Sequence, residues 1–250
     1  MISDTHYYEK NDIKHLNKLL DKIKKLKPNY ICISGDLTDT SRINDEKLLI
    51  NWLKRLSKIC KVVISIGNHE LYINKKDNIY GLNYELFEKI EKINNVYVLD
   101  NKNIVLDNIN FIGINLPIEY YYNSERNIDN DKYFAEIKGN KKYYNILLCH
   151  SPINVLKSEL LKDKNIDLIL SGHMHGGVVP NILRRIIKHA GIISPAKKMF
   201  PKITYGNILK DNTNIIISSG ITIFSNISNL KLLNFLFSSE IVNIKIKKSN

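Results

Sequence analysis

The chain has 250 residues, of which 44% are hydrophobic and 25% are charged, and this usage is that of a globular protein with a sizeable core. It excludes a fibre, a disulfide-rich scaffold and a wholly disordered chain. The formal net charge of +12 fits a surface that meets nucleic acid, an anionic membrane or a phosphorylated substrate, or else a generic solvated face in a chain rich in Lys, Asn and Ile.

The first part of the chain predicts alternating helices and strands. Residues 1–4 are typical of the end of a strand whose first residues are missing. Residues 12–26 have apolar side chains at helical spacing, and Pro28 ends that helix. The same criteria predict helices at 45–59, 84–93 and 155–161, and short apolar runs predict strands buried on both faces at 30–34, 62–66, 146–149 and 168–170.

Several shorter apolar runs predict further strands. Residues 96–99, 104–106 and 111–114 are separated by Asp-Asn turn signals, and this pattern predicts a meander of neighbouring strands. Late strands are expected at 215–217 and 241–246. The predicted order of helices and strands is therefore that of an α/β protein.

No internal repeat and no linker divides the chain, so we expect one domain over residues 1–250. Two long loops are expected, at 118–130 and 180–207, and loops of this length usually serve a function. No stretch reaches the roughly 18 apolar residues of a membrane span, and no signal peptide is recognisable. We therefore expect a cytoplasmic protein whose contact with a membrane, if any, is peripheral.

The three cysteines are Cys32, Cys60 and Cys149, and each lies in or beside an apolar run without C-x-x-C spacing. We interpret them as buried free thiols in a reducing compartment, and not as disulfides or thiolate ligands. The candidate site residues are therefore sought among Asp, Asn and His.

Four of the buried strands end in a small residue followed by Asp, Asn or His. Because ligand-binding residues gather at the carboxyl ends of strands in α/β sheets, we expect these side chains to converge on one edge of one sheet. With the N-terminal segment, the motifs are Asp4-Thr5-His6, Gly35-Asp36-Leu37-Thr38-Asp39, Gly67-Asn68-His69-Glu70, His150-Ser151-Pro152 and Gly172-His173-Met174-His175-Gly176-Gly177.

Histidine usage supports a shared site. Five of the seven histidines lie in these motifs, and the other two, His15 and His189, are expected to be exposed or structural. Taken singly, each motif has an ordinary explanation as a turn, a helix cap or a hydrogen-bonded core histidine. To explain all five motifs in these ordinary ways would require five independent coincidences.

The residue types select a class of metal. Carboxylate, amide and imidazole ligands without cysteine suit Mn, Fe or Zn, with Mn²⁺ the expected ion in vitro. Seven such residues are too many for one ion, so we expect two ions, which would clamp the attacking and leaving oxygens of an in-line displacement.

In this order the motifs resemble the calcineurin-like metallophosphoesterase superfamily, whose pattern is D-x-H, G-D-x-x-D, G-N-H-[DE], H and G-H-x-H. The resemblance implies a four-layer α/β/β/α sandwich of two mixed β-sheets flanked by helices. It implies that Asp36 bridges two metal ions alongside a hydroxide. The other implied ligands are Asp4, His6 and His175 for the first metal, and Asn68, His150 and His173 for the second.

The resemblance also implies two catalytic roles. His69 would donate a proton or a hydrogen bond to the leaving-group oxygen, and Asp39 would orient His69 and stabilise its cationic form. The alternative for Asp39 is a local turn or cap residue. Glu70 is expected to be structural and outside the site.

Within the superfamily, residues 172–177 and the tail around 195–200 resemble a bacterial branch whose members are often found at the membrane or cell wall. Met174 stands where Thr is common and Val178 where Gln is common, which implies different substrate contacts near the second metal. The basic stretch 183–198 is expected to be a solvated loop or to lie on an anionic membrane surface.

Tyr120, Tyr121 and Tyr122 are expected either to form a wall of the substrate cleft or to pack within their own loop. The function expected overall is hydrolysis of a phosphomono- or phosphodiester, lipid- or nucleotide-linked, by a monomer with no specific nucleic-acid partner. One alternative is a basic nucleic-acid or membrane-surface binding protein with a vestigial metal site, although no expected ligand is missing. A nuclease is the other alternative.

Overall fold

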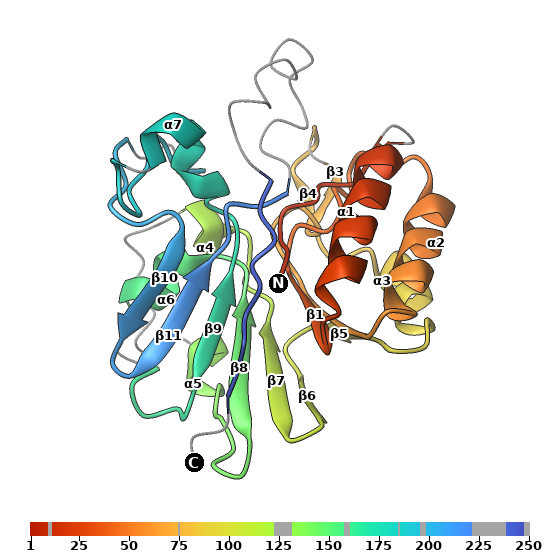
Figure 1. The fold of residues 1–250 in the computed structure, drawn as a ribbon. Helices are drawn as coiled ribbons and strands as arrows, with labels where there is room; N and C mark the ends of the chain where they lie inside the picture. The colour runs from red at the N-terminus through yellow and green to blue at the C-terminus, as the bar shows by residue number, and fades with distance from the viewer. Residues whose placement is uncertain are drawn as a thin grey trace.

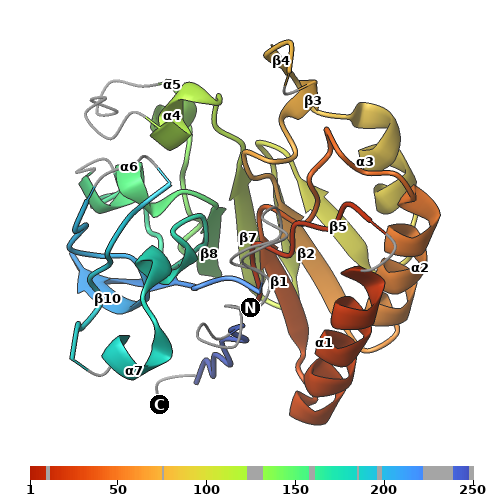
Figure 2. The same ribbon diagram turned by 90° about the horizontal axis from the view of Figure 1, so that it is seen from above.

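The computed structural model describes residues 1–9, 12–74, 76–122, 132–157, 161–184, 186–195, 199–221 and 239–247. Two β-sheets face each other, and helices cover the outer side of each, as Figures 1 and 2 show from two directions. This arrangement confirms the predicted α/β class with its four layers.

The first sheet has three strands in the order β1-β2-β5, and all of its pairs among the described residues are parallel, whereas two mixed sheets were expected. Helices α1, α2 and α3 cover its outer face (Figure 2). The side chains of Asp45 and Asn83 cap α2 and α3 by accepting hydrogen bonds from backbone N–H groups of the first turn. The bounds are α1 Asp12–Leu26, β1 Tyr30–Ser34, α2 Glu46–Ser57, β2 Lys61–Ser65, α3 Tyr84–Glu91 and β5 Val96–Leu99.

The second sheet has six strands in the order β10-β11-β9-β8-β7-β6. Its central pairs are parallel and the two edge strands are antiparallel. The strands are β6 Asn103–Leu106, β7 Ile109–Ile114, β8 Tyr144–Cys149, β9 Leu168–Ser171, β10 Gly206–Lys210 and β11 Thr213–Ile217. The remaining elements are β3 Tyr72–Asn74, β4 Ile79–Tyr80, α4 Glu119–Tyr122, α5 Lys132–Ala135, α6 Pro152–Lys157, the 3₁₀ turn η1 His175–Val178 and α7 Asn181–Arg184.

Alternation along the strands builds two hydrophobic cores. In β1, Ile31 and Ile33 pack beneath the helices, whereas Cys32 points toward the second sheet. Phe111 and Leu148 of the second sheet belong to the same inter-sheet core as Cys32. Because both faces of these strands are covered, their sequences are nearly continuous apolar runs.

The predicted meander is wrong. β5 pairs with β2 in the first sheet, and only β6 and β7 form an antiparallel hairpin. The turn signals at Asp100 and Asn101 show where the chain turns, but strands buried on both faces do not reveal which sheet they join.

The C-terminal segment also differs from its prediction, since the structure assigns no strand to 241–246. Instead, Val242 exchanges two backbone hydrogen bonds with Met1, of 2.8 and 3.0 Å. The first expected long loop, 118–130, contains α4, and its residues 123–130 lie outside the described residues. The second, 180–207, contains α7 and the start of β10. The predicted helix at 155–161 starts earlier, as α6, and its residues 158–160 also lie outside the described residues.

Other expectations concern cysteines and membrane spans. Cys32 and Cys149 are buried free thiols as predicted, and Cys60 is half-buried and free. Across the described ranges, no helix combines the length and apolar character needed to span a bilayer.

Candidate metal centre

The five motifs converge at the carboxyl ends of strands from both sheets. Gly35 and Ile66 follow β1 and β2 of the first sheet, whereas His150 and Gly172 follow β8 and β9 of the second. The expectation of one edge of one sheet is therefore wrong, because the strands divide between two sheets whose carboxyl ends meet.

The N-terminal segment reaches this place by running beside β1. Ile2 bridges Ile33 in parallel, and the backbone N–H groups of Asp4 and His6 donate to Gly35 and Asp36 carbonyls at 3.1 and 3.0 Å. The Asp4 and His6 side chains are buried. A segment distant from the G-H-x-H motif in sequence is thereby brought into contact with it.

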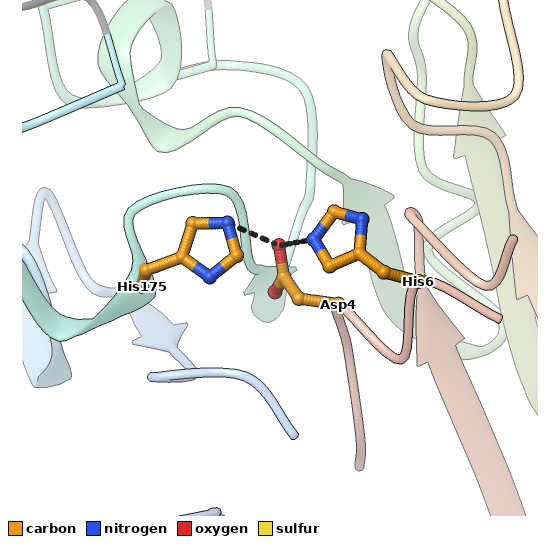
Figure 3. A group of neighbouring side chains, drawn as sticks. All are labelled: Asp4, His6 and His175. Carbon is orange, nitrogen blue, oxygen red and sulfur yellow. Dashed lines mark ion pairs between the residues drawn. The ribbon is translucent and has the colours of Figure 1, made fainter. Parts of the chain in front are cut away.

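Asp4, His6 and His175 form the first group of candidate ligands, shown in Figure 3. His175 Nε2 lies 3.7 Å and His6 Nε2 lies 4.0 Å from Asp4 Oδ1. One ligand atom from each residue lies within 4.8 Å of the others. These are the three residues predicted to hold the first metal, and the structure brings them together.

Asp36, His150 and His173 form a second group, and all three are buried. His150 Nδ1 lies 2.7 Å from the Ser34 carbonyl, which leaves its Nε2 facing Asp36 Oδ2 at 3.0 Å. His173 Nε2 lies 3.2 Å from the Tyr121 carbonyl. Backbone carbonyls thus fix both imidazole rings, as is usual for histidines that bind metals.

Asp36 also belongs to a third group, with His6 and His69. Its Oδ2 lies 3.8 Å from His6 Nε2, and its Oδ1 accepts the backbone N–H of His69 at 2.8 Å. Asp36 therefore lies between the first and second groups, which is the place expected of a bridging ligand.

Asn68 supplies the amide oxygen of the predicted set. Its side chain is buried, and its Nδ2 donates to the Tyr122 hydroxyl at 3.3 Å. Its Oδ1 has no hydrogen-bond partner among the described residues. A buried acceptor left unpaired is unfavourable by about 1–3 kcal/mol, and a cation would remove that penalty.

The backbone at the candidate ligands is strained. Non-glycine residues seldom adopt a positive φ, and such conformations cost about 1–3 kcal/mol each. Five of the seven candidate ligands do so: Asp4 (53°), His6 (46°), Asp36 (51°), His173 (67°) and His175 (46°). Strain concentrated in this way is typical of a functional site.

The motif glycines make room for ligands of other motifs. A Cβ on Gly35 would lie 2.5 Å from the His150 ring, and a Cβ on Gly67 would lie 2.4 Å from Asp36 Oδ1. A Cβ on Gly172 would lie 2.5 Å from Asp4 Oδ2. Each glycine before a candidate ligand therefore serves the close packing of another one.

The protonation states of the buried groups in the centre depend on one another. Burial opposes charge on His150, but the Asp36 carboxylate, together with Asp4 and the Ser34 carbonyl, outweighs burial and raises the pKa of His150 to about 10. Burial lowers the pKa of His173 to about 3, with His150 adding to the shift, and burial also holds the pKa of His6 well below its usual value. His6 and His173 are therefore neutral, which is the form that binds metal.

His69 and Asp39 lie together, as predicted. His69 Nδ1 is 3.4 Å from Asp39 Oδ2, and the Asp39 carboxylate is buried. Ser41 donates to Asp39 Oδ1 at 2.9 Å, and Arg42 lies 3.6 Å from Oδ2. Burial alone would raise the pKa of Asp39, but His69, together with Ser41 and Arg42, outweighs burial and lowers that pKa.

Glu70 is structural, as predicted, but the sequence did not reveal its partners. Its buried carboxylate accepts the backbone N–H groups of Gly67 (2.7 Å), Thr38 (2.9 Å) and Asp36 (3.0 Å), and so ties the loops after β1 and β2 together. Burial, with Asp36 nearby, raises the pKa of Glu70 to about 7. Its place directly after His69 was the available signal.

The three tyrosines divide between the two expectations. Tyr120 is fully buried and packs in the core. The ring of Tyr121 borders His150 and His173, and the Tyr122 hydroxyl joins Asn68 to the Tyr72 hydroxyl, which is 2.9 Å away. Tyr121 and Tyr122 therefore border the centre.

The two remaining histidines lie outside the centre, as predicted. His15 is exposed on α1, and His189 is exposed with its Nδ1 2.8 Å from the Tyr205 carbonyl. The donor set that does converge consists of carboxylate, amide and imidazole groups, which suits divalent ions such as Mn, Fe and Zn. The residues present therefore fit a pair of metal ions.

Comparisons with known proteins show the family of the chain. The sequence model of the calcineurin-like phosphoesterase family matches residues 1–177. An uncharacterized metallophosphoesterase of Campylobacter jejuni is 31% identical over 185 residues, which cover 72% of this chain and 44% of that protein. One of Helicobacter pylori is 25% identical over 179 residues, with coverage of 72% and 44%.

The chain thus spans less than half the length of these curated relatives. Among solved structures, a dimetal phosphatase of Danio rerio is similar with a TM-score of 0.47 and 12% identity, covering 88% of this chain and 86% of that one. The family assignment rests on the sequence matches alone.

Proposed function

The chain belongs to the calcineurin-like phosphoesterase family, whose members are hydrolases of phosphoric esters, and we propose that it hydrolyses a phosphomonoester or phosphodiester at the candidate metal centre. One observation above all supports this proposal. The Asp and His side chains of all five motifs form three groups of ligand atoms, each within 4.8 Å, and Asp36 and His6 are each shared between two groups.

We assign the ligands as follows from this geometry. Asp4, His6 and His175 would hold one ion, and Asp36 would be shared between the two ions. Asn68, His150 and His173 would hold the other, with the unpaired Asn68 oxygen as its neutral ligand. A neutral oxygen adds no negative charge where an anionic phosphate must approach.

When bound, two such ions would lower the pKa of a water at the site and so supply hydroxide near neutral pH. His69 is placed to give a proton to the leaving oxygen, because its ring is partly exposed (16%) while its Nδ1 faces the buried Asp39. Asp39 favours the protonated form of His69 and fixes its ring. Ser41 and Arg42 in turn hold the Asp39 carboxylate in place.

The proposal is tested by turnover of an aryl phosphate and an aryl phosphodiester, with Mn²⁺ present and after chelation. Because the chemistry depends on the ions, chelation is expected to abolish turnover, and Asp36→Asn and His173→Ala should do the same. His15→Ala is the matched control, since His15 is exposed and lies outside the centre. Chelator-resistant turnover, or full activity of either centre variant, would overturn the mechanism.

We further propose that the natural substrate carries its phosphate on a lipid or a nucleotide. Relative kcat/KM values for a lipid phosphoester, a nucleotide and the aryl esters would rank these classes. A preference for the aryl esters over both would contradict this second proposal without affecting the first.

A further inference from the structure

The segment from residue 180 to residue 210 differs in charge from the rest of the chain. It contains seven Lys or Arg residues and no Asp or Glu. Among the described members, Lys188 and Lys202 are exposed. Such a segment is attracted to any surface of high negative charge density.

The same segment exposes large apolar side chains. Ile182 is 81% exposed, Ile186 is 78%, Phe200 is 72% and Met199 is 55%. Exposed Ile and Phe side chains this close in sequence need an explanation, because a soluble surface normally shows them singly. We call these four residues the 182–200 surface.

Local geometry turns these side chains outward. Ile186 continues the turn of α7 through a hydrogen bond to Leu183, so Ile182 and Ile186 lie on one side and Arg184 lies on the opposite side. The Arg184 guanidinium faces inward, where it donates to the Ser219 hydroxyl at 2.9 Å and to the Val179 carbonyl at 3.3 Å. The inward anchor thus fixes the outward direction of the two isoleucines.

The second part of the surface is presented by a strained turn. Met199 bridges Ile193 in an antiparallel pair, and Phe200 donates its backbone N–H to the Ile192 carbonyl. Phe200 has a φ of 50°, a conformation that is uncommon for a bulky residue. The turn therefore holds an aromatic ring in solvent at an energetic disadvantage.

Hydrogen bonds connect both parts to the chain that follows the candidate metal centre. Ile192 and Ile193 donate to the Gly177 carbonyl, and a Cβ on Gly177 would lie 2.3 Å from the Gly191 backbone. The Tyr205 hydroxyl hydrogen-bonds to the Arg184 and Ile187 carbonyls. Gly177 follows His175 by two residues, so these hydrogen bonds connect the surface to the turn that carries a candidate ligand. Figure 1 shows α7 beyond the upper end of the second sheet.

From the coincidence of outward apolar side chains, exposed lysines and an absence of acidic residues in this sequence segment, we propose that the 182–200 surface docks the protein on an anionic lipid bilayer. The apolar side chains enter the boundary between headgroups and acyl chains, and Lys188 and Lys202 lie against the negative headgroups. A neutral apolar partner would not select for the charge, and a nucleic acid would not select for the isoleucines.

Vesicle sedimentation tests the proposal with the full chain and needs no turnover, so its outcome is independent of the proposed hydrolysis. Wild type is expected to sediment with vesicles of phosphatidylglycerol and phosphatidylcholine, and to stay in the supernatant with phosphatidylcholine alone. High salt should weaken the binding, because screening reduces the attraction of the lysines.

The double variant Ile182→Ser/Ile186→Ser should bind the anionic vesicles about tenfold or more weakly, since two apolar side chains no longer enter the bilayer. Ile79→Ser/Tyr84→Ser is the matched control, because both residues are exposed but lie on β4 and α3. All these variants should keep wild-type turnover of a soluble aryl phosphate.

Two results would overturn the proposal. The first is a failure of wild type to bind anionic vesicles, or binding by the double variant that equals that of wild type. The other is a concentration-dependent dimer, measured by light scattering, that the double variant abolishes, because the surface would then join two copies of this chain.

Discussion

The candidate metal centre and the 182–200 surface lie a few residues apart in sequence, yet they follow opposite rules. The centre is buried, strained and crowded, so that even a methyl group on Gly67 or Gly172 would strike another candidate ligand. The surface is exposed, and its side chains contact solvent. Chemistry here depends on individual residues, whereas docking depends on the sum of apolar area and charge. Substitutions should therefore separate the two.

The largest effect is expected from Asp36→Asn. This change removes the carboxylate shared between the two groups, so turnover should fall by about 1000-fold or more, and metal content should fall with it. Vesicle binding should not change. Parallel measurement of kcat/KM, bound metal and sedimentation checks this, and loss of vesicle binding in Asp36→Asn would break the separation of centre and surface.

His69→Asn should lower kcat by about 100- to 1000-fold, because it removes the proposed proton donor. Metal content should stay at the wild-type level, since His69 is not among the proposed ligands. Asp39→Asn should have a smaller effect in the same direction. If His69→Asn loses metal instead, then the third group, His6, Asp36 and His69, would be a true ligand set.

Tyr122→Phe tests whether the Tyr122 hydroxyl orients the Asn68 side chain in the centre. The variant removes the hydroxyl that accepts the Asn68 amide, so the amide can turn and metal affinity should fall by about tenfold. Mn²⁺ titration followed by calorimetry measures this. Tyr80→Phe is the matched control, because its hydroxyl bonds only the exposed Asn78 among the described residues. Equal affinity in both variants would show that Tyr122 does not orient Asn68.

Much of the fold could be predicted from the sequence, for physical reasons that the structure makes plain. Residues 12–26 and 30–34 have the predicted bounds because a strongly amphipathic helix and a doubly buried strand leave clear patterns. All seven predicted ligand residues lie in or beside the centre. The order of the motifs was enough to predict these residues, because four motifs follow strands and the first motif lies in the segment that runs beside β1.

What could not be predicted depends on pairing across the chain. The sequence of β5 carries no mark of the sheet it joins, which is why the meander was wrong. The roles of Glu70, Tyr122 and Arg184 arise from contacts with residues 32 to 54 positions away. Periodicity reports only the local environment, so contacts of this kind become visible only in three dimensions.

The smallest effect is expected from Phe200→Asn. Asn tolerates a positive φ better than Phe does, so the free energy of unfolding should change by less than about 0.5 kcal/mol. Turnover of a soluble substrate should be unchanged, while binding to anionic vesicles should weaken. Thermal or urea unfolding with a vesicle assay checks both parts, and a marked loss of stability would show that Phe200 packs against the fold.

The central claim, that Asp36 is shared by two metal ions, is tested most directly by metal stoichiometry. Wild type and Asp36→Asn would be dialysed against Mn²⁺, and the bound metal per chain measured by elemental analysis. Wild type is predicted to hold two ions per chain, and Asp36→Asn fewer than one. A wild type that holds one ion or none while it hydrolyses phosphoesters, or an Asp36→Asn variant that still holds two, would contradict the claim.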